Sequence, residues 1–165
     1  MIKAIFAIDI NGGMGNKGSL PWPYDAEDMR WFKSHTENQV VIMGSGTWLD
    51  PNMPSPLPNR INVVISSQNP DKFLGANHVI KTDDLNTALH EIELQYKDKS
   101  CWIIGGSKLL STTRHLITDA YITHYQSEYT CDVTLDITTW LKNTIIQEES
   151  YGRNKIFRRY VCTRI

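Results

Sequence analysis

The sequence predicts one α/β domain over residues 1–165, with a central mixed sheet flanked by about four helices. Apolar runs without alternation, such as residues 2–8 and 39–43, are typical of parallel strands covered on both faces. Glycines and then helix-favouring residues follow two such runs, as in strand–turn–helix units. The tail differs, because residues 144–146 and 156–162 flank a polar turn and indicate an antiparallel pair. The sheet should therefore be mostly parallel, with antiparallel strands at its C-terminal end.

The composition narrows the class of protein. With 41% hydrophobic and 21% charged residues, the chain resembles an ordinary soluble globular protein, and its net charge of -1 argues against a general nucleic-acid grip. The apolar N-terminal run reaches Asp9 too soon for a membrane span or a secretory signal. Three widely spaced cysteines, Cys101, Cys131 and Cys162, argue against a disulfide framework and a zinc site. We expect a cytoplasmic protein that binds no metal, nucleic acid or membrane.

Residues 11–19 form a glycine-rich loop after the first strand. Four glycines in nine residues disfavour both helix and strand, so we expect a mobile loop. Because it stands directly before Pro21 and Trp22, it is a candidate lid. A plain flexible hairpin would explain the same composition.

A stiff turn and a helix follow this loop. Pro21 and Pro23 flank Trp22 and favour an extended backbone there. The helix is expected over about residues 25–35, with Asp25 as its N-cap.

Asp28 is the main chemical candidate in this helix. It occupies the capping-box position and lies one helical turn before Phe32. A carboxylate between apolar walls has a raised proton affinity, which suits proton chemistry or recognition of a flat, amidine-bearing ring. Alternatively, Asp25, Glu27 and Asp28 only complement the helix dipole.

Two later stretches offer binding groups. The strand over residues 39–43 runs into Gly44-Ser45-Gly46-Thr47, where exposed backbone N–H groups and a hydroxyl suit an anion. A proline-rich loop over residues 51–58 then leads to Arg60, which suits a bidentate pair with a carboxylate. A solvated arginine is the alternative.

The remaining elements complete the α/β order. Strands are expected over residues 61–67, 78–81, 101–104 and 120–125, and a helix over about 85–96 that begins at Asp83 or Asp84. The strand at 101–104 runs into Gly105-Gly106-Ser107-Lys108, which has neither the P-loop spacing nor a third glycine.

Taken together, these stretches resemble dihydrofolate reductase over essentially the whole chain. The likeness rests on Gly15 through Trp22, Asp28 with residues 31–33, residues 41–44, Thr47-Trp48, residues 57–60, Ser66-Ser67, residues 104–106, residues 121–123 and Asp132. The resemblance implies a dihydrofolate reductase-like fold, a monomer, and reduction of 7,8-dihydrofolate to 5,6,7,8-tetrahydrofolate by NADPH. It also implies a role in one-carbon and thymidylate metabolism.

The resemblance also implies residue roles. Asp28, Trp22, Leu20 and Thr123 match catalytic positions, with the lid from Gly15 to Leu20 excluding water. The substrate-binding positions matched are Ile5, Ala7, Asp28, Phe32, Lys33, Leu57, Arg60 and Thr123. The cofactor-binding positions matched are Ala7, Gly13, Gly15, Gly18, Ser19, Leu20, Gly44, Ser45, Gly46, Thr47, Ser66, Ser67, Lys81, Ile104, Gly105, Gly106, Ser107, Lys108 and Leu109.

Three positions depart from the family pattern. Ser45-Gly46 stands where a basic residue is common, Ser107 where a third glycine is usual, and Leu110 where an aromatic hydroxyl is frequent. These departures concern the cofactor more than the folate, and we expect Lys81 and Lys108 to supply the missing positive charge. Solvated lysines are the alternative.

Two other functions fit the same fold. A reductase of a pyrimidine intermediate in flavin synthesis would lack the pairing of Trp22 with Asp28. A nucleotide-binding or structural module without turnover stays open because of Ser45, Gly46 and Leu110.

Overall fold

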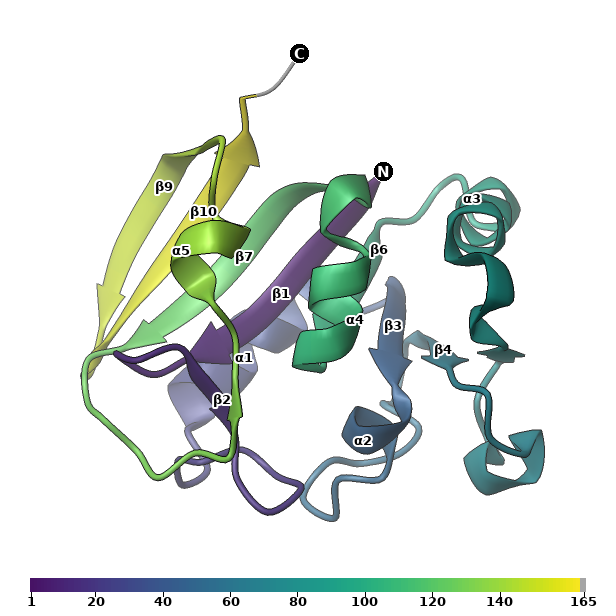
Figure 1. The fold of residues 1–165 in the computed structure, drawn as a ribbon, viewed down its shortest axis with the longest axis horizontal. Coiled ribbons are helices and arrows are strands. Elements are labelled where there is room, and N and C mark those ends of the chain that lie inside the picture. Colours follow the sequence, from purple (N-terminus) through teal and green to yellow (C-terminus); the bar gives the residue numbers. More distant parts are fainter. Residues whose placement is uncertain (164–165) are drawn as a thin grey trace.

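The computed structural model describes residues 1–163. Its centre is an eight-stranded sheet (Figure 1). The strands follow one another across the sheet as β5 (His78–Ile80), β4 (Ile61–Ile65), β3 (Val40–Gly44), β6 (Cys101–Gly105), β1 (Ile2–Ile8), β7 (Ile117–Tyr125), β10 (Lys155–Cys162) and β9 (Thr144–Gly152). Neighbouring strands from β5 to β7 are parallel, whereas β10 is antiparallel to both β7 and β9. The predicted fold class is confirmed.

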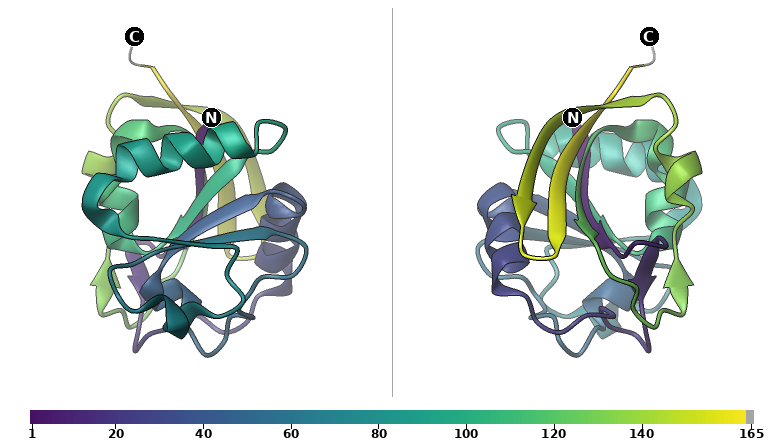
Figure 2. Two further views of the ribbon diagram at one scale, coloured as in Figure 1. Left: turned by 90° about the vertical axis from the view of Figure 1, so that its right-hand side faces the viewer. Right: turned by 90° about the vertical axis from the view of Figure 1, so that its left-hand side faces the viewer.

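Helices cover both faces of this sheet. They are α1 (Ala26–Thr36), α2 (Ser45–Trp48), α3 (Leu85–Gln95), α4 (Ser107–Thr112) and α5 (Ile137–Trp140), with 3-10 turns η1 (Pro70–Phe73), η2 (Thr82–Asp84) and η3 (Arg114–Leu116). Figure 2 shows α1 on one face and α4 and α5 on the other. None of the helices in residues 1–163 is long and apolar enough to span a bilayer.

Alternation along the buried strands builds a core on each face. One cluster joins alternate residues of the strands, such as Ala4 and Phe6, to Leu89 of α3, Leu110 of α4 and Trp140 of α5. The opposite cluster joins strand residues Val41, Met43 and Val64 to Trp48 and Leu57, with Phe32 of α1 packed against it. Ile5 and Ala7 alternate with the first set of residues, so they face the α1 side of the sheet.

The helix caps follow from local sequence. The Asp25 side chain accepts the N–H groups of Glu27 and Asp28, so the predicted N-cap is confirmed. Asp84 caps α3 in the same way through the Thr87 N–H. The capping-box role of Asp28 was wrong, because its carboxylate accepts from Thr123 in the site described below.

The glycine-rich loop contains a strand that we did not predict. Gly13–Gly15 forms β2, which pairs with β8 (Val133–Thr134) as a separate two-stranded sheet. Asp9 holds the loop's start by accepting the N–H groups of Gly13 at 2.8 Å and Tyr129 at 2.9 Å. Partners far along the chain therefore order glycines that local propensity leaves free.

Other elements begin or end at different residues from those we predicted. The strand expected from residue 120 begins at residue 117, and the one expected over 144–146 continues to residue 152. Pairing of Ile117 with Ile2 of β1 extends the first strand, and pairing along β10 extends the second. The helix α5 was missed because its four residues are too few to show a helical period.

Candidate active site

The acidic centre is Asp28, which α1 presents to the sheet. Its side chain accepts a hydrogen bond of 2.6 Å from the Thr123 hydroxyl of β7. Asp28 is 6% exposed and Thr123 1%. Burial raises the pKa of the Asp28 carboxyl from 3.8 to about 6, although the Thr123 hydrogen bond opposes this rise. An acid with this pKa can both hold and release a proton near neutral pH.

The strands place two apolar residues beside this pair. Ala7 of β1 lies opposite Thr123 in register, and Ile5 lies opposite Tyr121. Since β1 and β7 are parallel neighbours, Ile5, Ala7 and Thr123 share the face that Asp28 approaches. Ile5 is buried and Ala7 half-buried, so together they form an apolar floor next to the acid.

Trp22 brings a buried polar atom to this side of the sheet. Its side chain is buried, and the indole Nε1–H makes no hydrogen bond within the described residues. Its ring packs against Tyr125, with ring centroids 4.4 Å apart. A buried donor left unpaired costs free energy, which a water or a ligand acceptor would recover.

Phe32 and Leu57 form a second apolar wall of the site, and Arg60 lies beside Phe32. Leu57 is fixed by Asn62, whose amide bonds both the Leu57 N–H at 2.9 Å and its carbonyl at 3.0 Å. The Arg60 guanidinium lies 5.6 Å from the centre of the Phe32 ring and donates to the Thr36 hydroxyl at 3.2 Å. This tether pre-orients the guanidinium at the edge of the wall.

A second group of candidates lies where β3 and β6 end. A Cβ atom at Gly44 would stand 3.9 Å from the Gly105 carbonyl oxygen and from the Gly106 nitrogen, so the two turns touch. Gly105 has φ +138°, a conformation that side chains disfavour. Cβ atoms added at Gly46 or Gly106 would meet nothing within 4 Å. These turns therefore expose bare backbone, which suits close approach of a ligand's phosphates.

The predicted cofactor-binding residues considered next lie in two separate places. The Ser66 N–H donates to the Ile80 carbonyl at 2.9 Å, so Ser66, Ser67 and Lys81 lie together at the ends of β4 and β5. Lys108 instead follows β6 in the first turn of α4. Because β3 and β4 separate β6 from β5, the two lysines start roughly 14 Å apart across the sheet. They therefore lie at separate positions along this edge of the sheet.

The lid candidates are held by side chains from elsewhere in the chain. The Lys17 N–H donates to the Asp132 carboxylate at 2.9 Å, and Asn52 donates to the Ser19 hydroxyl at 2.8 Å. Gly18 has φ +80°, which allows the tight turn between Asn16 and Ser19. Leu20 is 45% exposed at the end of the lid.

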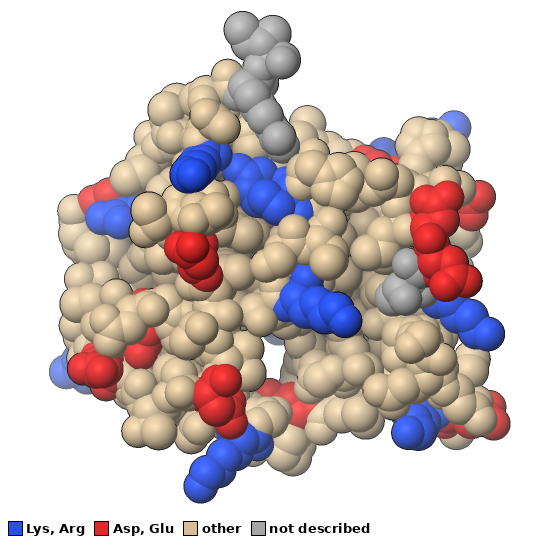
Figure 3. Space-filling view, viewed as in Figure 1, with Lys and Arg blue, Asp and Glu red and all other residues tan. Residues whose placement is uncertain are grey.

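In Figure 3 the surface is hollowed between the part of the molecule that carries β2 and the part that carries α2, below α4. Two predicted residues lie apart from it: Leu109 is buried in the core, and Lys33 is exposed beside Glu37.

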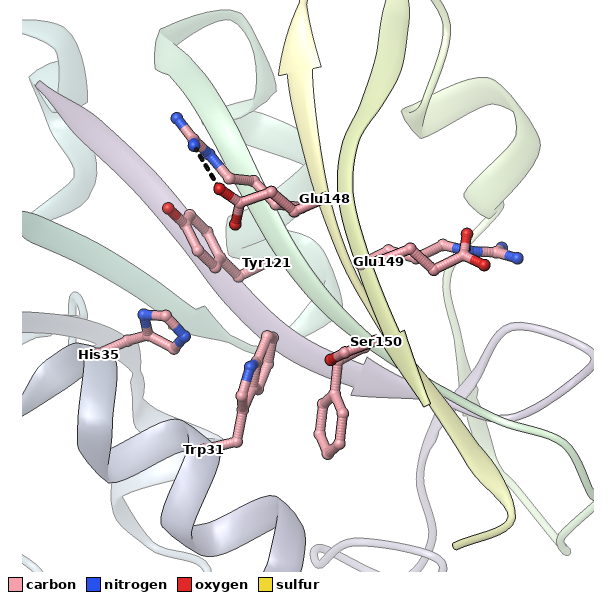
Figure 4. A pocket seen from close by; sticks show the side chains of 9 residues that line it. Trp31, His35, Tyr121, Glu148, Glu149 and Ser150 are labelled. Atoms are coloured by element: carbon pink, nitrogen blue, oxygen red, sulfur yellow. Dashed lines mark hydrogen bonds and ion pairs between the residues drawn. The ribbon is translucent and has the colours of Figure 1, made fainter. Parts of the chain in front are cut away.

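A different hollow, of about 300 Å³, lies beside the C-terminal half of α1. Figure 4 shows Trp31 and His35 of α1 directed toward Tyr121, with Glu148 and Ser150 of β9 on the other side. None of the predicted site residues lines this hollow. We place the site at Asp28 instead, because its buried carboxyl has a raised pKa and is held there by Thr123.

Three residues near Asp28 escaped sequence analysis: Asp25 in its second role, Tyr125 and Lys155. The Tyr125 hydroxyl donates to Asp25 at 2.8 Å, and the buried Lys155 ammonium lies 3.1 Å from Asp25. A lysine in an alternating strand gives no local signal of burial, so only tertiary packing reveals this cluster.

Comparisons with known proteins agree with this geometry. A family model described as dihydrofolate reductase matches residues 1–163. The viral dihydrofolate reductase of Saimiriine herpesvirus 2 (strain 488) is 39% identical over 119 residues, which are 66% of this chain and 55% of that protein. The dihydrofolate reductase of Buchnera aphidicola subsp. Acyrthosiphon pisum (strain APS) is 37% identical over 123 residues, 74% of this chain and 71% of that protein.

A solved structure is also similar over nearly the whole chain. Dihydrofolate reductase from Enterococcus faecalis, complexed with NADP(H) and RAB-propyl, aligns with a TM-score of 0.77 and 25% sequence identity. The alignment covers 98% of this chain and 95% of that one.

Proposed function

The chain belongs to the dihydrofolate reductase family, and we propose that it reduces 7,8-dihydrofolate to 5,6,7,8-tetrahydrofolate with NADPH, using Asp28 as its acidic group. The observation that carries this proposal is the buried Asp28–Thr123 pair, with a carboxyl pKa of about 6. We also propose that the chain acts in one-carbon metabolism on a small-molecule substrate, as a monomer in the cytoplasm.

Asp28 has two tasks in this reaction. A pterin presents an exocyclic amino group next to a ring N–H, and one carboxylate can accept both hydrogen bonds. Thr123 donates to one oxygen of Asp28 and so fixes the carboxylate plane. Asp28 also raises the local supply of protons, because its pKa leaves an appreciable protonated fraction near neutral pH.

Trp22 positions the proton-carrying water. Its buried Nε1–H has no hydrogen-bond partner among residues 1–163, and a water bound there would lie on the same side of the sheet as Asp28. Packing on Tyr125 holds the indole in place. The lid from Gly15 to Leu20 then excludes bulk water during the reaction.

The remaining substrate contacts are apolar, apart from the tail. Ile5, Ala7, Phe32 and Leu57 would sandwich the pterin and the aminobenzoyl ring. Arg60 would pair with the α-carboxylate of the glutamate tail, since its tether to Thr36 leaves part of the planar fork available.

NADPH, when bound, supplies the hydride. The open backbone at Gly46 and Gly106 and the contact between the Gly44 and Gly105 turns fit a pyrophosphate. Ser66, Ser67 and Lys81 would hold the 2′-phosphate, while Lys108 and Thr47 would serve the pyrophosphate that NADPH and NADH share. This assignment differs from the expectation from the sequence, in which Lys81 and Lys108 together supplied the positive charge for the 2′-phosphate.

A spectrophotometric assay tests the function. Purified protein, NADPH and dihydrofolate should lose absorbance at the reduced-cofactor band, and omission of dihydrofolate should abolish the loss. No oxidation of NADPH by a folded protein that binds both ligands would favour a module without turnover. Oxidation only with a pyrimidine intermediate of flavin synthesis would favour the other reductase.

A further inference from the structure

The turn between β9 and β10 is docked on the first turn of α1. The Arg153 N–H donates to the Glu27 carboxylate at 2.9 Å, and Lys155 pairs with the same carboxylate. A Cβ atom at Gly152 would stand 2.6 Å from Glu27 Oε1, so a side chain at this position would displace the Glu27 carboxylate. The hairpin therefore touches the helix one residue before Asp28.

Lys155 is the centre of this contact. It is 3% exposed, and its ammonium also lies 3.1 Å from Asp25 and 2.6 Å from the Arg153 carbonyl. A buried ammonium is retained only where such partners compensate for the lost water. Burial lowers the pKa of Lys155, but Glu27 and Asp25 raise it above its usual value, so the residue stays charged.

The same cluster reaches the tryptophan. Asp25, besides capping α1, accepts the Tyr125 hydroxyl at 2.8 Å, and the Tyr125 ring packs on Trp22. Farther along α1, Phe157 of β10 packs on Trp31, with ring centroids 4.8 Å apart. One strand thus holds α1 on both sides of Asp28.

We propose that Lys155 is a positioning residue for the reaction: by binding Asp25 and Glu27 it fixes the first turn of α1, and so sets the depth and the electrostatic surroundings of Asp28. The proposal rests on the function proposed above. The charged and titratable groups that face Asp28 are Asp25 and Glu27 from α1, Tyr125 from β7 and Lys155 from β10.

The charges around Asp28 predict the direction in which each substitution should change its pKa. Asp25 and Glu27 disfavour the ionised form of Asp28, whereas Lys155 favours it. Removing Lys155 should raise the pKa of Asp28, and removing the charge of Glu27 should lower it. A cluster without an electrostatic effect on Asp28 would give no such opposition.

The experiment titrates Asp28 in three variants. Lys155→Met should raise the midpoint of the Asp28 carboxyl, followed by its ¹³C chemical shift, by about half a pH unit, and Glu27→Gln should lower it by a similar amount. Arg158→Met is the matched control, because Arg158 lies on β10 like Lys155 but pairs with Glu149 of β9, at 3.0 Å, instead of with the first turn of α1. It should leave the midpoint unchanged.

Kinetics provide the second readout. The pH profile of kcat/KM should follow the same midpoints, and its low-pH plateau should fall about threefold to tenfold in Lys155→Met through misplacement of Asp28. If Lys155→Met does not fold, Glu27→Gln still tests the proposal. An unchanged midpoint of the Asp28 carboxyl in Glu27→Gln would overturn it. Midpoints that move in the same direction in both variants would also overturn it.

The two proposals fail separately. The carboxyl titration needs no turnover, so an inactive protein with opposed midpoint shifts would reject the proposed function and keep the role of Lys155. An active protein without those shifts would keep the proposed function and reject the role of Lys155.

Discussion

The substrate end of the site is built mainly from side chains, whereas the cofactor end is built mainly from backbone. At the substrate end, buried side chains meet: Asp28 and Thr123 stand 95 positions apart in sequence and are held by one hydrogen bond of 2.6 Å. At the cofactor end, the Gly44 and Gly105 turns expose backbone, and few side chains cover them.

This difference predicts different responses to mutation. A side-chain site in a low-dielectric environment depends strongly on single groups, because each one changes a proton affinity or leaves a partner unpaired. A backbone site divides binding among many N–H groups, and single charges around it are exposed and screened. We therefore expect the largest effects at Asp28 and the smallest at the cofactor lysines.

The largest effect is expected from Asp28→Asn. Loss of the carboxylate removes both the bidentate acceptor and the acid, so kcat/KM for dihydrofolate at neutral pH should fall by roughly 10²- to 10⁴-fold with the fold retained. Glu37→Gln, at the other end of α1, is the control and should stay near wild type. Steady-state kinetics measure both variants, and near wild-type kcat/KM in Asp28→Asn would reject the assignment.

The same residue should couple stability to pH. The pKa of Asp28 lies near 6 in the folded protein and near 3.8 when unfolded, so the folded state binds the extra proton and is stabilised on the acid side. Between pH 4.5 and 7 the free energy of unfolding of wild type should decline by about 2 kcal/mol relative to Asp28→Asn. Urea unfolding across this range checks the trend, and parallel curves would show that Asp28 is not buried as described.

An intermediate effect is expected at the exit of the substrate end. Arg60→Ala should weaken binding of ligands with a glutamate tail by about 1.5 to 3 kcal/mol, the loss of a charge-assisted pair. Diaminopyrimidine inhibitors without a tail should bind as before, and Lys33→Ala should change neither class much. Titration calorimetry separates the two, and equal losses in both ligand classes would make Arg60 structural.

The smallest effect belongs to the cofactor end. Lys81→Ala should reduce the preference for NADPH over NADH by about threefold, since an exposed ion pair is worth less than about 1 kcal/mol. Lys108→Ala should weaken both cofactors equally, and the NADPH preference of wild type should shrink as salt rises. Values of kcat/KM for each cofactor at low and high salt provide the measurement. An unchanged preference in Lys81→Ala would mean that another group recognises the 2′-phosphate.

Local chemistry made much of this molecule predictable. Apolar runs gave the buried strands, Asp25 and Asp84 gave the starts of α1 and α3, and glycines marked the turns after β3 and β6. Asp28 stood out because a family pattern and a helical position coincide there. Such features act within a few residues, so the sequence displays them directly.

Long-range packing decided the rest. The sequence by itself determined that an acid lies on a helix one turn before Phe32, and the family resemblance matched Thr123 to a catalytic position. Only the tertiary structure showed the hydrogen bond between Thr123 and Asp28, and Lys155 as the counter-charge of the neighbours of Asp28. The glycines of β2 form a strand only because Val133 and Thr134 pair with them. Burial and hydrogen bonding between distant segments set a group's proton affinity and a loop's order, and neither depends on the nearest residues in the chain.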